Sequence, residues 1–414
     1  MADKRLLDVD DARRAVLEAL PSLGAGEVEL DAALGRVLAR DVAAPFAVPP
    51  FDSSAMDGFA VRASDVAGAR AERPARLRLV GESRAGSPAQ VAVGAGEAVA
   101  ISTGAALPPE ADAIVRVEDS RTRDGQLEAL CAVGAGADVR RAGDDIQAGR
   151  TVLARGSVLG PGELGVLASL GHSSVPVADR PRTALLVTGD ELRGPGEDLV
   201  AGAIRDTNSF SIAALVRCAG GELARRERVR DEAAATTQAI EEAAHDSDVV
   251  VICGGVSVGA HDHVRASLAA LGAQQAFWGI ALKPGRPTWF GTLDGVPVFG
   301  LPGNPVSAIV TFVLLADPAL RALQGASPDA LRAEAILDQD YEKPRGRAHA
   351  LRCRLRRAED GWHATPTGAQ GSHVLTSMLD ADALAIAPTE ATALHAGDRV
   401  RIELLRPWLT GSAA

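Results

Sequence analysis

Two short apolar runs, each followed by a glycine-rich turn, constrain the fold of this chain more than any other feature. Residues 248–253 form a continuous run rich in β-branched side chains, which stops at the turn 254–257. Residues 296–299 form a second run, which breaks into the turn 300–305, and residues 306–312 then read as a helix. A short, continuous, β-branched run is typical of a strand buried on both faces. The segment therefore predicts two strand–turn–helix units of an α/β sheet.

The two turns favour a negatively charged ligand. Asn304 stands where a helix N-cap is expected, and Pro305 occupies the first helical position. A glycine turn at a helix N-terminus presents backbone N–H groups to an anion, and the cations Lys283 and Arg286 lie between the two turns in the sequence. The alternative for either turn alone is an ordinary connection, because short glycine motifs are common. The candidate binding residues are Gly254, Gly255, Ser257, Arg286, Pro302, Gly303, Asn304 and Pro305.

Three carboxylates are expected at the same edge of the sheet. Glu191 follows the apolar run 183–188, Asp262 follows the first glycine turn, and Asp231 precedes a helical run. Ligands of doubly wound sheets bind at the carboxyl ends of the strands. Carboxylates beside a phosphate site are typical ligands of Mg²⁺, so Glu191, Asp262 and Asp231 are candidate metal ligands. The alternative for Asp231 is a helix N-cap.

The regions before and after this segment have other patterns of apolar and polar residues. Residues 75–135 contain short alternating runs broken by glycine, which predict a small β-rich domain. From residue 182 strand-like and helix-like runs alternate, and beyond residue 335 apolar and polar residues alternate, as in Leu351, Cys353 and Leu355 against Arg352, Arg354 and Arg356. The last pattern predicts a small barrel or sandwich. We expect a multidomain α/β protein with four parts: a helical and extended domain (1–45 with 146–180), an inserted β-rich domain (46–145), a doubly wound, mostly parallel sheet (181–328) and a C-terminal β-barrel (329–414).

Two polar loops lie outside the predicted sheet. Residues 45–57 combine three prolines with a polar cluster that ends at Asp57, and residues 139–146 bring Arg140 and Asp145 to a turn. Ordered polar loops are frequent sites of function. The alternative for the first loop is a buried turn whose Asp and Ser side chains cap backbone groups, and for the second a surface salt-bridge turn.

Composition narrows the function further. The net charge is −11 with no long basic run, which argues against nucleic acid as a partner. His261 and His263 flank Asp262, but a zinc site needs a third nearby ligand. We see no signal peptide and no apolar run near the ~18 residues of a membrane span, so we expect a cytoplasmic protein without a membrane partner. Neither a zinc knuckle nor a disulfide framework is indicated by the spacing of the four cysteines, Cys131, Cys218, Cys253 and Cys353.

Several motifs resemble one known family. Residues 51–62, 188–192, 254–259 and 300–308 are similar, in order, to the motifs of molybdopterin molybdenumtransferase. This is the MoeA family, which is related to the E domain of gephyrin, and the resemblance covers nearly the whole chain. It implies that adenylylated molybdopterin and molybdate bind, that Mg²⁺ assists cleavage of the phosphoanhydride, and that AMP and the molybdenum cofactor leave.

The resemblance also implies site residues and partners. It implies an elongated homodimer, in which the α/β site faces the N-terminal segment of the other subunit, and a transient contact with the molybdopterin adenylyltransferase. Pro302 and Pro305 fall on the rigid turn of the family. The positions that match functional positions of the family are Asp57, Thr103, Arg140, Asp145, Glu191, Asp231, Asp262, Lys283 and Ser372.

One departure from the family keeps two alternatives open. Gly279 stands where the family commonly carries a lysine, and Arg286 replaces another usual lysine while keeping its charge. The first alternative is a non-catalytic molybdopterin-binding or scaffold paralogue. The second, which ignores the resemblance, is a phosphatase-like α/β enzyme that acts on a nucleotide.

Overall fold

A six-stranded sheet at the centre of the chain carries both strand–turn–helix units. The computed structural model of the chain describes residues 6–257 and 262–405. Along the sheet the strands are β16 (Glu222–Val229), β13 (Arg182–Thr188), β17 (Val249–Cys253), β21 (Val296–Leu301), β20 (Trp289–Leu293) and β18 (Gln274–Trp278). The first four are parallel, while β20 and β18 are antiparallel to their neighbours. The mostly parallel sheet predicted from the sequence is confirmed.

Helices cover both faces of this sheet. Successive side chains of a strand point to opposite faces, so apolar strands give each face its own core. Leu185 and Val187 of β13 belong to one core, while Ala184 and Leu186 belong to the other. The first core is closed by α1 (Val9–Glu18), α4 (Asn208–Cys218), α7 (Pro305–Thr311) and α8 (Asp317–Leu323). The second is closed by α5 (Ala233–Asp246) and α6 (His263–Ala270). The sheet is therefore doubly wound.

The helical run Pro305–Leu323 corrects one expectation from the sequence. It is long and apolar enough to cross a membrane by length and composition, contrary to the prediction that no run comes near that length. However, 89% of its most apolar window is buried inside the protein. Val310, Phe312 and Leu315 belong to the first core, so the run serves as a core helix.

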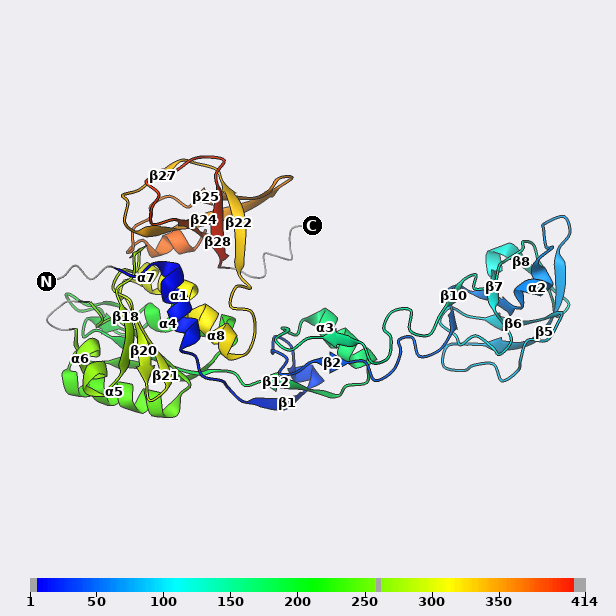
Figure 1. Cartoon of the computed structure of the whole chain (residues 1–414), viewed down its shortest axis with the longest axis horizontal. Coiled ribbons are helices and arrows are strands. Elements are labelled where there is room, and N and C mark those ends of the chain that lie inside the picture. Colours follow the sequence, from blue (N-terminus) through cyan, green and yellow to red (C-terminus); the bar gives the residue numbers. More distant parts are fainter. Residues whose placement is uncertain (1–5, 258–261, 406–414) are drawn as a thin grey trace.

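A small middle domain and a distal sheet domain extend away from the central sheet (Figure 1). In the middle domain β1 (Ala25–Glu29) pairs with β12 (Ser174–Ala178), β2 (Val42–Ala43) pairs with β11 (Thr151–Leu153), and α3 (Pro161–Ser169) packs nearby. The distal sheet has the order β7 (Ala113–Arg116), β4 (Gly58–Val61), β6 (Glu97–Ile101), β5 (Ala75–Ser83), β9 (Gln126–Ala129) and β8 (Ser120–Arg123), with α2 (Ala63–Val66) beside it. The predicted β-rich insertion is thus a sheet at the far end of an elongated molecule.

The C-terminal part closes into the predicted barrel. Its ring consists of β24 (Ala348–Ala358), β25 (Gly361–Pro366), β22 (Arg332–Leu337), β28 (Arg399–Leu404) and β26 (Ala383–Ala387), and β26 pairs back onto β24. The short strand β19 (Leu282–Lys283) leaves the α/β domain and adds to β24, with Lys283 opposite His349. The barrel is thereby attached directly to the segment that carries Lys283.

A buried ion pair fixes the barrel against the N-terminal helix. The guanidinium of Arg13, on α1, lies 3.2 Å from Glu403 Oε1 in β28, and both side chains are about 4% exposed. Arg332 also donates to Glu403, at 2.8 Å, and Asp329 accepts from Arg13 at 2.8 Å. Removing one partner of such a pair would leave an uncompensated buried charge. The network therefore holds the barrel in one orientation over the α/β domain.

The alternation along β24 predicts the wrong environment for Arg352. Arg354 and Arg356 are exposed as expected, but Arg352 is fully buried. Its guanidinium donates to the carbonyls of Ala350, Ala369 and Gly371 and to the hydroxyl of Ser377. The side chain therefore faces the segment 369–378 instead of solvent, and these acceptors compensate its burial.

Candidate functional site

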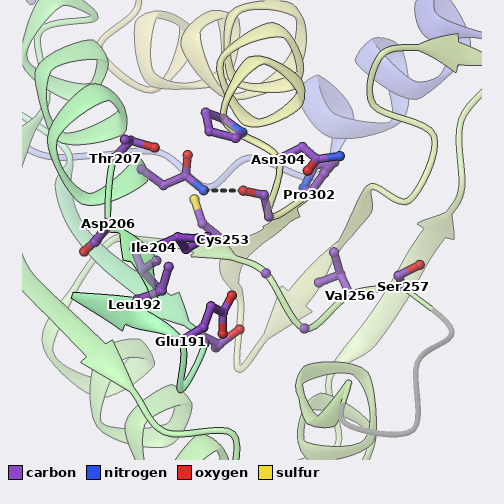
Figure 2. A pocket seen from close by; sticks show the side chains of 18 of the residues that line it. Glu191, Leu192, Ile204, Asp206, Thr207, Cys253, Val256, Ser257, Pro302 and Asn304 are labelled. Carbon is purple, nitrogen blue, oxygen red and sulfur yellow. Dashed lines mark hydrogen bonds between the residues drawn. The ribbon is translucent and has the colours of Figure 1, made fainter. Parts of the chain in front are cut away.

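A pocket of about 460 Å³ opens at the carboxyl ends of β13, β17 and β21. Both glycine turns line it, the first through Gly254, Gly255 and Ser257 and the second through the turn 302–305. Figure 2 shows Cys253 near its centre, Pro302 and Asn304 together at one side and Val256 and Ser257 at another. The two turns that the sequence singles out therefore meet around one cavity.

Glycine is required in the first turn because the backbone there is left-handed and closely packed. The φ angles of Gly254 and Gly255 are +95° and +63°. A Cβ atom on Gly254 would lie 2.7 Å from Thr188 Oγ1 and 2.9 Å from the Thr188 carbonyl oxygen. Such distances are shorter than van der Waals contact, so a side chain would push the turn away from β13.

The second turn begins α7 as predicted, with one difference. Asn304 occupies the N-cap position and Pro305 is the first helical residue, but the Asn304 side chain makes no capping hydrogen bond. Its amide Nδ2 instead donates to Ser372 Oγ of the barrel, at 3.3 Å. Ser372 thus reaches the rim of the pocket from another domain, although it is not among the described residues that line the cavity.

All three predicted metal ligands line the pocket. Glu191 lies in the turn after β13, Asp231 follows β16, and Asp262 precedes α6. The alternative interpretation of Asp231 as a helix N-cap is wrong, because α5 begins at Ala233 with Glu232 before it. Asp231 instead accepts the backbone N–H of Asp190 and donates its own to Asp190 Oδ1, both at 3.2 Å.

The three acids do not form a ready-made metal cluster. Within residues 6–257 and 262–405 no group of three His, Cys, Asp or Glu side chains is close enough to hold a metal ion. Hard oxygen ligands of this kind nevertheless suit Mg²⁺, which usually takes one or two carboxylates together with substrate phosphates and water. The donor set therefore fits a metal that binds together with a phosphate-bearing ligand. His261 lies outside the described residues, and His263 is the first residue of α6.

Neither of the predicted cations lines this cavity. Lys283 and Arg286 are exposed, and neither is among the described residues that line the pocket, although the neighbouring Pro287 is. Gly279 has a φ of +85°, and a Cβ atom on it would lie 3.0 Å from Leu6 Cδ2. A lysine at this position would therefore be strained in the present backbone.

The remaining candidates form a separate group in the distal part of the chain. Asp57 Oδ1 accepts the backbone N–H of Thr103 at 2.7 Å and its hydroxyl at 3.0 Å, and these bonds lower the pKa of Asp57. Arg140 lies in β10 (Val139–Arg140), which pairs with β3 (Ser53–Ser54), and Asp145 is exposed nearby in the sequence. Figure 1 shows β10 at the inner end of the distal domain, and the middle domain separates it from the α/β domain.

Sequence reasoning missed one wall of the pocket. Asp206, Thr207 and Asn208 line the cavity where the chain passes from β15 (Ile204–Arg205) into α4. Asp206 and Asn208 are only 4% and 6% exposed. The signal was a polar triplet directly before a helical run. Such triplets also occur at ordinary helix caps, so it did not stand out.

Comparison with known proteins agrees with this architecture. Three family profiles match in order: the MoeA N-terminal region, domains I and II (residues 7–171), a probable molybdopterin binding domain (184–322) and the MoeA C-terminal region, domain IV (334–405). The molybdopterin molybdenumtransferase of Bacillus subtilis is 33% identical over 98% of this chain and 96% of its own length. That of Haemophilus influenzae is 36% identical over 96% and 98%. The crystal structure of a molybdopterin biosynthesis MoeA protein from Pyrococcus horikoshii superposes with a TM-score of 0.85 at 31% identity, covering 97% of this chain and all of that one.

The fold and the matched domains define a transferase of molybdenum cofactor biosynthesis, whose α/β domain matches the profile of a probable molybdopterin binding domain. The resemblance seen in the sequence motifs is confirmed over almost the full length. The chain belongs to the MoeA family, the molybdopterin molybdenumtransferases.

Proposed function

We propose that this chain inserts molybdenum from molybdate into adenylylated molybdopterin in the cytoplasm, with Mg²⁺-dependent release of AMP. The observation that carries the proposal is the pocket in which two glycine turns and three carboxylates, Glu191, Asp231 and Asp262, line one cavity at the sheet edge. Glycine-turn amides supply donors for phosphate oxygens, and the acids supply ligands for a divalent cation. An adenylylated substrate presents both of the groups that this combination recognises.

Each set of residues has a role in this reaction. The turns 254–257 and 302–305 would hold the phosphates, and Glu191, Asp231 and Asp262 are the residues that would hold Mg²⁺. When bound, Mg²⁺ would supply positive charge that stabilises the negative charge of phosphate oxygens. Lys283, Arg286 and Ser372 are assigned to the molybdate oxyanion, because cations and hydroxyl groups can bind its oxygens. Ser372 is supported by its contact with Asn304 at the pocket rim.

The distal group requires a second copy of the chain in this proposal. Asp57, Thr103, Arg140 and Asp145 belong to or adjoin the distal domain and are not among the described residues that line the pocket, and Figure 1 shows the distal domain far from the α/β domain of the same chain. In an elongated homodimer the distal end of one subunit would face the α/β domain of the other, and the site would be shared. A transient contact with the molybdopterin adenylyltransferase would deliver the substrate.

The test is AMP release by the purified protein supplied with adenylylated molybdopterin, Mg²⁺ and molybdate. The proposal expects release that depends on both molybdate and Mg²⁺. Release that is indifferent to molybdate would support a nucleotide-cleaving hydrolase instead. Tight binding of the substrate without turnover would support a molybdopterin-binding scaffold, which Gly279 and the exposed positions of Lys283 and Arg286 favour.

A further inference from the structure

The wall of the pocket before α4 carries a buried carboxylate with one unused oxygen. Asp206 lines the cavity and is 4% exposed. Its Oδ1 accepts the backbone N–H of Ser209 at 3.0 Å, as a helix cap would. No hydrogen bond in the described part of the chain reaches its Oδ2. Helix capping therefore accounts for one oxygen of Asp206 and leaves the other without a hydrogen-bond donor among the described residues.

A second acceptor without a donor lies two residues further on. Asn208 lines the same cavity and is 6% exposed. Its Nδ2 donates to the carbonyl oxygen of Gly303 at 2.8 Å, the hydrogen bond drawn in Figure 2, and this contact fixes the orientation of the amide. Among the described residues its buried Oδ1 has no hydrogen-bond partner. Buried polar atoms are rarely left unpaired, so Asn208 Oδ1, in the same wall as the Asp206 carboxylate, points to a ligand that brings N–H donors.

The parts of the substrate differ in whether they carry the N–H donors that the acceptors of this wall need. Phosphate and molybdate oxygens are acceptors and would be repelled by a carboxylate. Adenine has its one exocyclic amino group between two ring acceptors. The 2-amino-4-oxopyrimidine ring of a pterin carries an amino group beside a ring N–H, two parallel donors that match a carboxylate in two-point fashion.

We propose that Asp206, together with Asn208, binds the 2-amino-4-oxopyrimidine edge of the pterin. This inference rests on the proposed function for the identity of the substrate, and it adds the orientation in the pocket. Figure 2 shows Asp206 and Thr207 on one side of the pocket and Val256 and Ser257 on another. The pterin end of the ligand therefore lies along the wall before α4, and its phosphates lie along the glycine turns.

The test is the affinity of Asp206→Asn for molybdopterin and for AMP, measured separately by titration calorimetry. Asparagine keeps an oxygen to cap Ser209 but turns the other atom into a donor that opposes the pterin donors. We expect molybdopterin to bind about tenfold to a hundredfold more weakly, as for the loss of hydrogen bonds to a charged group, with the AMP affinity unchanged. Asp248→Asn is the matched control, because Asp248 caps the N–H of Arg182 at 2.7 Å just before β17, at the opposite sheet edge.

A pterin analogue with oxygen at position 2 sharpens the test. This analogue lacks the amino donor, so Asp206→Asn should bind it at least as well as the wild type does. Unchanged molybdopterin affinity in Asp206→Asn, an equal loss for AMP, or no binding of molybdopterin to the wild-type chain would overturn the inference. These binding measurements use neither molybdate nor turnover. A selective loss of molybdopterin affinity in Asp206→Asn would support the inference even if the wild type released no AMP. Molybdate-dependent AMP release would support the proposed function even if the affinity loss were not found.

Discussion

The amide nitrogen of Asn304 donates to the hydroxyl of Ser372 at 3.3 Å, and this contact joins the second glycine turn to the C-terminal barrel. Asn304 lines the pocket, whereas Ser372 belongs to the segment that the buried Arg352 supports through the carbonyls of Ala369 and Gly371. The rim of the pocket is therefore held from two domains. Substitutions in the barrel should therefore change the turnover of the site at the sheet edge.

Ser372 and Asn304 are expected to act as a coupled pair. Ser372→Ala and Asn304→Ala should each lower kcat/KM for AMP release. The loss of transition-state stabilisation in the double variant should be smaller than the sum of the two single losses by about 0.5–1.5 kcal/mol. The measurement is a double-mutant cycle on molybdate-dependent turnover. Thr376→Ala, an exposed change in the same segment, is the control and should leave turnover unchanged. Strict additivity would show that the contact has no role in the reaction.

Gly254→Ala should damage both stability and ligand binding. Its φ of +95° and the 2.7 Å approach to Thr188 Oγ1 predict a loss of about 1–3 kcal/mol in the free energy of unfolding, together with a displaced turn. Gly272→Ala is the matched control, because Gly272 has a φ of +82° with no heavy atom within 4 Å of the added Cβ. Urea unfolding and AMP titration measure the two effects. Equal losses in both variants would mean that close packing against Thr188 is unimportant.

Arg352→Met should destabilise the barrel strongly. The substitution removes the hydrogen bonds that the guanidinium donates to three carbonyls and to the Ser377 hydroxyl, and we expect a loss of about 3 kcal/mol or more. Arg354→Met, two residues along the same strand, removes an exposed pair with Asp380 and should change stability by less than about 1 kcal/mol. Chemical unfolding of the two variants compares them directly, and similar values would contradict a supporting role for Arg352.

The carboxylates of the pocket should be needed for turnover but not for folding. Glu191→Gln and Asp262→Ala are each expected to lower AMP release at least about a hundredfold, since each removes a charge placed to hold Mg²⁺. Glu222→Gln serves as a control, because Glu222 is exposed at the start of β16, the opposite edge of the sheet. Circular dichroism should be unchanged in all three. A normal rate in either pocket variant would refute its assignment as a metal ligand.

His349 should make the protein sensitive to acid. Burial, followed by the charges of Lys283, Lys343 and Arg347, lowers the pKa of His349 from 6.5 to about 4, and its Nδ1 lies 2.9 Å from the Tyr341 hydroxyl. The unfolded chain therefore binds a proton at higher pH than the folded chain does, so this group's contribution is complete above about 6.5 and is lost as the pH falls towards 4. His349→Gln should flatten the pH dependence of urea unfolding in this window. An unchanged slope would contradict it.

The sequence predicts the elements whose pattern is local. β17 and the start of α7 lie where the apolar runs and Pro305 place them, and the parallel order of the sheet follows from their alternation with helices. The burial of Arg352 could not be predicted, because it depends on the segment 369–378 folding back onto β24. Alternation along a strand gives the face of a side chain and does not give what covers that face.

The sequence predicts only part of the site, because some of its residues are placed by contacts that a local pattern does not give. Residues directly after buried strands, such as Glu191 and the turn at Gly254, reach the pocket because the topology brings those strand ends together. Asp206 and Asn208 enter it through the β14 (Leu192–Arg193) and β15 excursion, which has no strong periodicity. The separation of Lys283 from the cavity follows from its strand joining the barrel, a pairing between residues far apart in the chain.

The central claim is that the pocket between the glycine turns and the three acids binds the adenylylated pterin. A crystal structure with adenylylated molybdopterin and Mg²⁺, without molybdate, tests it most directly. We expect phosphate density against Gly254 and Gly303, with a metal ion between the phosphates and at least one of Glu191, Asp231 and Asp262. Ligand density elsewhere on the chain, with this pocket empty at saturating ligand, would contradict the account.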